Sequence, residues 1–218
     1  MVSNKYPRSP HLPWSPGGTS DDKRMLDVSS LLGVDLVVTE KMDGSNLTYS
    51  SSGVFARSHS TTPNHPSFAF AKATQANIFL PDGVSVFCEY CYAVHSIEYN
   101  FLPNYSLVFG VRDDIKNEWW DWDSVEEMAK EINLPTVPVL FRGTIITDKE
   151  LKTLTDKLGS QPSFFGGTRE GVVIRKACGY SDFAFSQSLA KWVRKNHVQT
   201  DEHWKNSQIK PQKLQKPI

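Results

Sequence analysis

The sequence predicts an α+β fold in which largely antiparallel sheets are flanked by helices. Short apolar runs bounded by glycine, proline or polar residues are typical of strands, and two such runs flank a tight turn at Ser52 and Gly53. Capping-box patterns that begin at Ser124 and Thr147 predict helices between later runs. Strands and helices interleave irregularly, with a hairpin present, which favours α+β over a regular parallel α/β arrangement.

The expected strands follow the apolar runs along the chain. Residues 36–39, Leu-Val-Val-Thr, predict a buried strand, and residues 46–51 and 54–58 form the two arms of the hairpin. The remaining strands are expected at residues 84–93, 107–112, 136–141, 171–175 and 189–194.

Three helices are expected between these strands. Residues 68–79 contain several alanines and a lysine and stand just before a proline, which favours a helix that ends there. The capping box at Ser124 predicts a short helix to about Ile132. The capping box at Thr147 predicts a longer helix that ends at Gly159.

The composition is that of a folded protein without a global charge bias. The 218 residues suit one large domain, or one domain with a small appendage, and 39% of them are hydrophobic. The 24 basic and 24 acidic residues balance, so a basic binding surface would require local segregation of charge. Three cysteines, no membrane-length apolar run and no signal-peptide core predict a soluble, cytoplasmic protein without a membrane partner.

The two ends of the chain differ in composition from its middle. Residues 1–24 are rich in proline, glycine and serine and predict an ordered or semi-ordered loop. Residues 205–218 carry four lysines, two prolines, three glutamines and no acidic residue. This basic tail suits either a solvated, partly disordered terminus or a contact with a phosphate backbone. We therefore expect one domain over residues 25–204.

Lys41 follows the first predicted strand, in the stretch Glu-Lys-Met-Asp-Gly-Ser-Asn at residues 40–46. A strand fixes the position of such a lysine, and apolar surroundings lower the cost of holding its amine neutral. Gly44 allows a sharp turn close to a ligand. The pattern suits a covalent nucleophile, although a short lysine–aspartate–glycine pattern also occurs by chance in surface hairpins.

Further motifs follow Lys41 in a recognisable order. They are Arg57 in Phe-Ala-Arg-Ser, Glu89 in Val-Phe-Cys-Glu-Tyr, His-Ser-Ile-Glu-Tyr at residues 95–99, Phe109 in Leu-Val-Phe-Gly, Glu170 in Glu-Gly-Val-Val-Ile-Arg and Lys191 in Leu-Ala-Lys-Trp-Val-Arg. The series resembles the motifs of covalent nucleotidyltransferases, the superfamily of ATP-dependent DNA ligases, RNA ligases and mRNA capping enzymes. Over residues 40–204 the chain most resembles RNA ligases of the RNA ligase 2 type. The resemblance implies the nucleotidyltransferase fold, an ATP-grasp-like adenylation domain.

The resemblance also implies a chemistry for Lys41. Its amine would attack the α-phosphorus of ATP and form lysyl-AMP, the AMP would pass to a 5′-phosphate RNA end, and a 3′-hydroxyl would then displace it. Because an ordinary lysine is protonated at neutral pH, we expect burial and nearby cations to lower the pKa of Lys41, with Lys191, Arg194 and a bound metal as the candidate cations. Asp43 is expected to orient the turn after the nucleophile.

Binding roles for the other motif residues are implied in the same way. Glu89 and Glu170 are expected to hold Mg²⁺ or Mn²⁺, which prefer hard oxygen ligands. Phe109 is expected to stack on adenine, and Arg57 and Asn46 to hold phosphate or ribose groups. The residues expected around the nucleotide are Glu40, Lys41, Asn46, Arg57, Glu89, Phe109, Glu170 and Lys191, of which Lys41, Glu170 and Lys191 are expected to be catalytic. The expected partners are RNA ends and an end-healing kinase or phosphatase, with the protein acting as a monomer.

Two features depart from the superfamily pattern. The last motif commonly repeats its lysine two residues later, where this chain has Val193, and Arg194 stands at the odd offset that reverses the face of a strand. The sequence also ends soon after this motif, where DNA ligases and capping enzymes continue into an oligonucleotide-binding domain. An RNA ligase is therefore favoured, and the alternatives are a minimal ATP-dependent DNA ligase and a non-catalytic nucleotide- or RNA-binding module.

Other conspicuous residues have structural interpretations. His95 is expected to be a structural histidine or a substrate-side contact and not a general base. Cys88 and Cys91 would point to opposite faces of a strand, which disfavours a metal site. Two roles stay open for residues 1–24, which are to cover the nucleotide pocket or to guide the RNA end.

Overall fold

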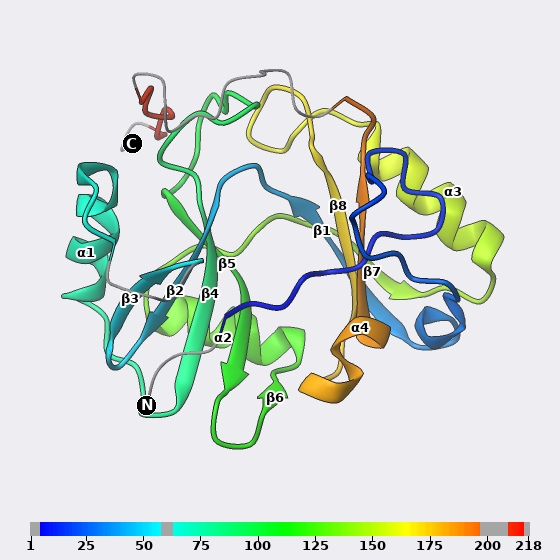
Figure 1. Cartoon of the computed structure of the whole chain (residues 1–218), viewed down its shortest axis with the longest axis horizontal. Coiled ribbons are helices and arrows are strands. Elements are labelled where there is room, and N and C mark those ends of the chain that lie inside the picture. The colour runs from blue at the N-terminus through cyan, green and yellow to red at the C-terminus, as the bar shows by residue number, and fades with distance from the viewer. Residues whose placement is uncertain (1–4, 58–62, 197–208, 216–218) are drawn as a thin grey trace.

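The computed structural model describes residues 5–57, 63–196 and 209–215, which form two antiparallel sheets side by side (Figure 1). The four-stranded sheet has the order β10-β8-β1-β7, and the six-stranded sheet has the order β3-β2-β4-β5-β6-β9. The first sheet contains β1 (Asp35–Lys41), β7 (Val139–Thr144), β8 (Gly171–Lys176) and β10 (Leu189–Val193). The second contains β2 (Ser45–Ser50), β3 (Gly53–Ala56), β4 (Val84–Tyr90), β5 (Ser106–Asp113), β6 (Glu118–Trp119) and β9 (Tyr180–Ser181). The predicted α+β fold with antiparallel sheets is confirmed.

The described residues form four α-helices, α1 (Ala69–Gln75), α2 (Trp122–Glu131), α3 (Asp148–Gly159) and α4 (Phe185–Ser188). The capping box at Thr147 is confirmed, because its hydroxyl accepts from the Glu150 N–H at 3.2 Å. The predicted cap at Ser124 is wrong. Asp121 caps α2 instead, accepting from the Ser124 N–H at 3.0 Å, since its carboxylate is the stronger acceptor and stands one turn earlier.

Several boundaries differ from those expected. The helix expected at 68–79 is limited to α1, after a 3₁₀ turn at Pro66–Phe68. The strand expected at 136–141 begins later, at β7, because Pro138 has no N–H to give to a ladder. The short elements β6, β9 and α4 were not expected, since two to four residues give no periodic pattern.

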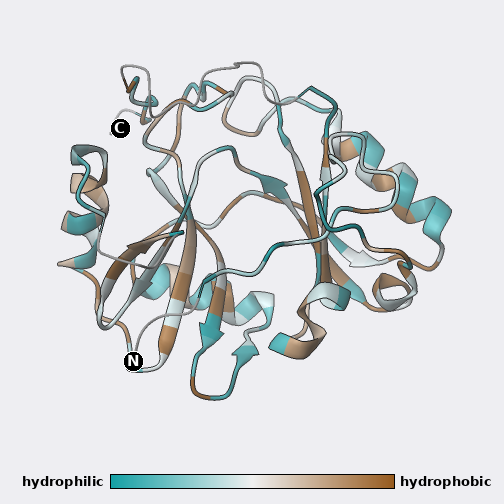
Figure 2. Cartoon of the chain, in the orientation of Figure 1, coloured by the Kyte–Doolittle hydropathy of each residue, from teal (hydrophilic) through white to brown (hydrophobic). Residues whose placement is uncertain are grey.

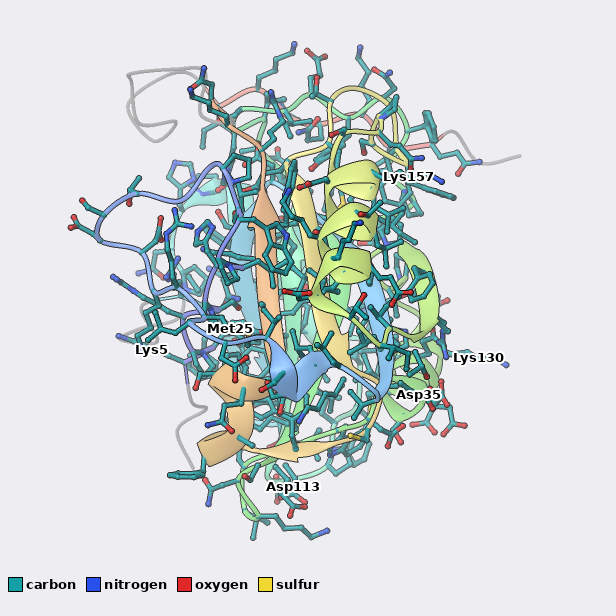
Figure 3. The ribbon with its side chains drawn as sticks, turned by 90° about the vertical axis from the view of Figure 1, so that its right-hand side faces the viewer. Lys5, Met25, Asp35, Asp113, Lys130 and Lys157 are labelled. Carbon is teal, nitrogen blue, oxygen red and sulfur yellow. The ribbon has the colours of Figure 1, made fainter. Side chains whose placement is uncertain are left out.

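A small apolar cluster lies between β4, β6, α4 and β10, and two large apolar cores hold the sheets. One packs the six-stranded sheet against α2, with Leu47, Val86 and Val125 among its buried members. The other packs the four-stranded sheet against α3 and the N-terminal segment, with Leu12, Val172 and Leu151. Hydrophobic colour follows the strands in Figure 2, and Figure 3 shows α3 lying across the outer face of the four-stranded sheet with Lys157 directed away from it. No helix among the described residues is both long enough and apolar enough to cross a membrane.

The register of the four-stranded sheet decides which side chains face the second sheet. Thr39 pairs with Val173, which also pairs with Lys191. Lys41 pairs with Gly171 in the next row of the same face. Because side chains alternate along a strand, Lys41 and Lys191 share a face, and Glu40 lies on the opposite one.

Residues 5–24 form an ordered segment beside β10, as the ordered alternative for this loop predicted. The Leu12 N–H donates to the Lys191 carbonyl at 2.8 Å, and the Lys191 N–H donates to the Pro10 carbonyl at 2.9 Å. His11 is 2% exposed and Leu12 is fully buried. In Figure 1 this segment crosses the front of the molecule between the two sheets.

Residues 209–215 dock on the loop that joins β4 to β5. The Gln212 side chain is buried there, where it accepts from the Tyr99 N–H at 2.7 Å and donates to the Ile97 carbonyl at 2.6 Å. A solvated terminus is therefore the wrong interpretation for this part of the tail. The boundary expected at residue 204, like the end of the hairpin arm at Ser58, lies outside the described residues.

Candidate active site

A pocket of about 470 Å³ opens between the two sheets, a volume within the usual range for small-molecule sites. Both sheets and the N-terminal segment contribute to its lining. The predicted site residues that line it are Glu40, Lys41, Asn46, Arg57, Glu89, Phe109 and Lys191. Glu170 joins this group through its contact with Lys41. The structure thus brings residues from six separate motifs to one place.

Lys41 and Glu170 form the centre of the pocket. Lys41 Nζ lies 2.8 Å from Glu170 Oε2, with the lysine side chain 26% exposed and the glutamate side chain 7% exposed. The pairing of Lys41 with Gly171 in the sheet places the preceding residue, Glu170, beside the amine. Gly171 is required where β8 lies against β10, because a Cβ there would lie 2.0 Å from the Trp192 carbonyl oxygen.

The turn after Lys41 is fixed by the His-Ser-Ile-Glu-Tyr motif. Asp43 Oδ2 accepts from the N–H groups of Ser96 and Ile97, at 2.7 and 2.8 Å. The Asp43 N–H donates to the Tyr99 hydroxyl at 2.7 Å. The Asp43 carboxylate is thus directed into this loop and holds the backbone that follows the lysine, in agreement with the orienting role expected for it.

Gly44 connects the same turn to the second sheet. Its N–H donates to Glu89 Oε1 at 3.0 Å, and a Cβ at this position would lie 2.7 Å from the Tyr90 carbonyl oxygen. A side chain would therefore push the turn away from β4. The hydrogen bond holds the Glu89 carboxylate next to the turn that carries Lys41.

The pKa values of the two lysines in the site are shifted in opposite directions. Burial alone would lower the pKa of Lys41, but the carboxylates of Glu170, Glu89 and Asp43 together outweigh burial and raise it above the ordinary value. The expected lowering of this pKa is therefore wrong for the protein alone. Burial, followed by the charge of Lys41, lowers the pKa of Lys191 instead.

The two glutamates fit a divalent cation. Burial raises the pKa of Glu89 to about 7, with Lys41 opposing the rise and Glu170 adding to it, so a cation beside the two carboxylates would offset the cost of burying their charge. Mg²⁺ and Mn²⁺ commonly bind through one or two carboxylates together with water and substrate phosphates. No group of three or more His, Cys, Asp and Glu side chains among the described residues could hold a metal by itself. Phosphate and water would therefore complete the coordination.

Phe109 lies in a β-bulge of β5. Phe87 pairs with Gly110 and Cys88 pairs with Val108, which leaves Phe109 as the extra residue and re-aims its side chain. Its ring packs against the Tyr6 ring in edge-to-face geometry, with the ring centroids 4.9 Å apart. An Arg175 Nη1 hydrogen bond to the Phe109 carbonyl fixes the bulge from the other sheet. The ring borders the pocket, where a flat base could stack on it.

Asn46, Arg57 and Glu40 differ in what they offer the pocket. Asn46 Oδ1 is a buried acceptor without a hydrogen-bond partner among the described residues, so a ligand hydroxyl could satisfy it. Arg57 is exposed at the rim. The Glu40 carboxylate is fully buried, lies 3.2 Å from Arg169 Nε and accepts from the Phe164 N–H at 2.9 Å. Its side chain therefore holds the fold beside the pocket.

Several residues of the pocket were not predicted. Arg175 lines the pocket, and its alternation with Gly171 and Val173 on β8 was a usable signal. Tyr6, Arg8, Asp22 and Lys23 come from the N-terminal segment, whose composition gave no such signal. Asp22 Oδ1 lies 3.9 Å from Lys191 Nζ, so this segment also brings an opposite charge to a predicted catalytic residue.

The remaining candidates lie outside the pocket lining. Arg194 follows β10, which ends one residue earlier than expected, and its N–H donates to the Glu170 carbonyl at 3.0 Å. His95 Nε2 lies 3.4 Å from Ser45 Oγ. Cys88 and Cys91 are free and buried in the same core, so the argument from opposite faces is wrong, because Cys91 follows the end of β4.

Comparisons with known proteins agree with this arrangement. An RNA ligase from Naegleria gruberi, in an apo form, superimposes with a TM-score of 0.55 and 16% identity over 78% of this chain and 52% of that chain. An archaeal ATP-dependent RNA ligase superimposes with a TM-score of 0.51 and 15% identity over 78% of this chain and 45% of that chain. This chain thus spans about half the length of these structures, and at such identities the likeness concerns the fold.

The sequence comparisons point in the same direction. No curated protein matches the chain. The profile of the RNA ligase family matches residues 34–193, a span from the residue before β1 to the last residue of β10. With the fold, the pocket and this match together, the chain belongs to the RNA ligase family.

Proposed function

We propose that this protein is an ATP-dependent RNA ligase that works through a lysyl-AMP intermediate on Lys41. The observation that carries the proposal is the contact of Lys41 Nζ with Glu170 Oε2 at 2.8 Å, beside a pocket of nucleotide size. A structure of the Naegleria gruberi RNA ligase with a TM-score of 0.52 and 16% identity is described with ATP and Mn. This supports ATP and a divalent cation as ligands of the same fold.

In the first step the Lys41 amine attacks the α-phosphorus of ATP. The nitrogen–phosphorus bond forms, the bond to the β-phosphate oxygen breaks, and pyrophosphate leaves. The lysine must lose a proton before it attacks, and Glu170 Oε2 is placed to accept it. Lys191 and Arg175 would stabilise the negative charge of the transition state. A divalent cation held by Glu89 and Glu170 would neutralise the carboxylates that keep Lys41 protonated.

In the later steps the AMP is transferred to RNA. The 5′-phosphate oxygen attacks the phosphoramidate, the nitrogen–phosphorus bond breaks, and Lys41 regains its amine. The 3′-hydroxyl then attacks the 5′-phosphate and AMP leaves. Phe109 and Asn46 would hold the adenosine throughout, so that its binding also positions the leaving group. We propose residues 25–204 as the adenylyltransferase domain, with the N-terminal segment completing its pocket and RNA ends as the partner.

Intact-protein mass spectrometry tests the proposal directly. After incubation with Mg²⁺ and ATP we expect an AMP-sized adduct that is absent with GTP or NAD and absent from the Lys41→Ala variant. Lys157→Ala, a change on the exposed surface of α3, is the matched control and should keep the adduct. A starting protein that is already adenylated should lose its adduct when pyrophosphate is added.

The same experiment, followed by a sealing assay, separates the alternative functions. A clean protein that forms no adduct with any nucleotide would favour a non-catalytic binding module. Sealing of matched nicked duplexes then separates the two ligases, because preference between RNA and DNA depends on 2′-hydroxyl contacts and helix shape. Sealing of DNA alone would overturn the assignment to RNA and favour the minimal DNA ligase.

A further inference from the structure

Two exposed phenylalanine rings and one buried ring form an aromatic surface that is attached to the residue before Lys41. Phe101 is 44% exposed and Phe164 is 62% exposed, while Phe165 is buried between them. The ring centroids of Phe101 and Phe165 lie 6.3 Å apart, and those of Phe164 and Phe165 lie 5.3 Å apart, both in edge-to-face geometry. We call this group, Phe101, Phe164 and Phe165, the aromatic ledge. Two of its rings thus present apolar surface to solvent while the third anchors them.

The ledge is built from two loops that belong to different sheets. Phe101 comes from the loop between β4 and β5, and Phe164 from the loop between α3 and β8; Figure 1 shows both loops at the same end of the molecule. The Asn100 N–H donates to the Phe165 carbonyl at 2.9 Å. At Gly167, with φ +80°, a Cβ would lie 2.8 Å from the Glu98 carbonyl oxygen, so the loops meet at a contact that needs glycine.

Both loops are also attached to the residues on either side of the nucleophile. The Phe164 N–H donates to Glu40 Oε2 at 2.9 Å, and Glu40 directly precedes Lys41. The Ile97 N–H donates to Asp43 Oδ2 at 2.8 Å, two residues after Lys41. The position of the ledge is therefore fixed relative to the reacting amine by one partly buried hydrogen bond on each side.

The C-terminal segment adds positive charge beside the ledge. Lys210 Nζ and Lys213 Nζ lie 2.6 and 3.4 Å from the two oxygens of Glu98, and the lysine side chains are 60% and 66% exposed. The Leu102 N–H donates to the Lys213 carbonyl, which places this lysine next to the chain that follows Phe101. Two ammonium groups share one carboxylate, so this contact leaves one positive charge at the surface.

We propose that the aromatic ledge and the two lysines bind unpaired RNA bases and their phosphates next to the end that is joined. This inference rests on the proposed ligase function and names a surface for its second substrate. Exposed phenylalanine rings offer the faces on which any base can stack, and the lysines match the charge of the backbone. Unpaired bases are specified because a base within a duplex has no free face to offer.

Binding of a short single-stranded RNA with a 5′-phosphate tests the ledge. We expect the Phe101→Ala/Phe164→Ala protein to bind this probe about 5- to 150-fold more weakly in fluorescence anisotropy, the range that corresponds to loss of one stacked base. Phe164→Leu, which keeps apolar bulk but removes the ring, should bind more weakly than Phe164→Trp. Lys210→Ala/Lys213→Ala should reduce the dependence of affinity on salt concentration.

The control is another exposed phenylalanine. Phe183 is 94% exposed and precedes α4, which lies at the opposite end of the molecule from the ledge in Figure 1, so Phe183→Ala should leave RNA binding unchanged. Transfer of AMP to the RNA is measured per adenylated protein, which corrects for any loss of folded material. Equal RNA affinity in the ledge and control variants would overturn the proposal that the ledge binds RNA. Failure of the unmodified protein to form an AMP adduct would instead overturn the ligase function.

Discussion

The two described ends of the chain support the same site in different ways. The N-terminal segment adds main-chain hydrogen bonds to β10, buries Leu12 in a core, and lines the pocket itself. The C-terminal segment is attached through the buried amide of Gln212 to the loop that holds Asp43. The first is therefore part of the pocket wall, and the second acts on it through a loop. Composition alone left the role of both ends open.

The two ends should differ most in how much a leucine truncation lowers the free energy of unfolding. Leu12 is fully buried, and Leu12→Ala should lower the free energy of unfolding by about 2–5 kcal/mol because it leaves a cavity. Leu214, in the C-terminal segment, is 37% exposed, and Leu214→Ala should cost far less. Urea denaturation of both variants measures the two values. Equal losses would mean that the C-terminal segment is as much a part of the core as the N-terminal one.

Gln212 should produce the next largest effect. Gln212→Leu leaves the Tyr99 N–H and the Ile97 carbonyl without their buried partner, at about 1–3 kcal/mol for each group. Because the same loop holds Asp43, the rate of AMP adduct formation should fall as well. Lys210→Ala, in the same segment but exposed, is the control and should leave the unfolding curve unchanged. A normal adduct rate in a destabilised Gln212→Leu protein would show that the loop does not position Lys41.

The pH dependence of stability should distinguish the N-terminal end. Burial, followed by the charge of Lys191, lowers the pKa of His11 to about 4, whereas an unfolded histidine titrates near pH 6.5. The unfolded state therefore binds the extra proton first, and stability from this group is complete above pH 6.5 and lost as pH falls toward 4, at up to about 1.4 kcal/mol per pH unit. His11→Gln should flatten this slope in unfolding curves measured across the window. An unchanged slope would exclude His11 as its source.

Much of the fold could be predicted because its strands carry clear local signals. The apolar run that became β1 and the turn at Gly53 that joins β2 to β3 depend only on neighbouring residues. The cap of α2 and the start of β7 could not be placed as well, because competing signals at Asp121 and Pro138 lie within three residues of those expected. The position of such a boundary depends on which of two neighbouring residues takes the role of cap or strand start.

The site shows the same division between local and spatial information. The motifs identified Lys41, Glu89, Glu170 and Lys191, which do meet at one pocket. The sign of the Lys41 pKa shift could not be read from the sequence, because it depends on how many carboxylates approach the amine in space. For the same reason no local pattern indicated that Tyr6 would pack against Phe109, which lies more than a hundred residues further along the chain.

The strand register behind the pocket has a consequence for which changes this protein can tolerate. Lys191, Val173 and Thr39 form one row across three strands, and Trp192 occupies the next position on the opposite face, against α3. Insertion or deletion of a single residue between α4 and Lys191 would exchange these two faces and turn the ammonium into an apolar core. Insertion or deletion of two residues would keep each side chain on its present face of the sheet. We therefore expect length variation near this strand to follow a parity rule, while substitutions on the outer surface remain free.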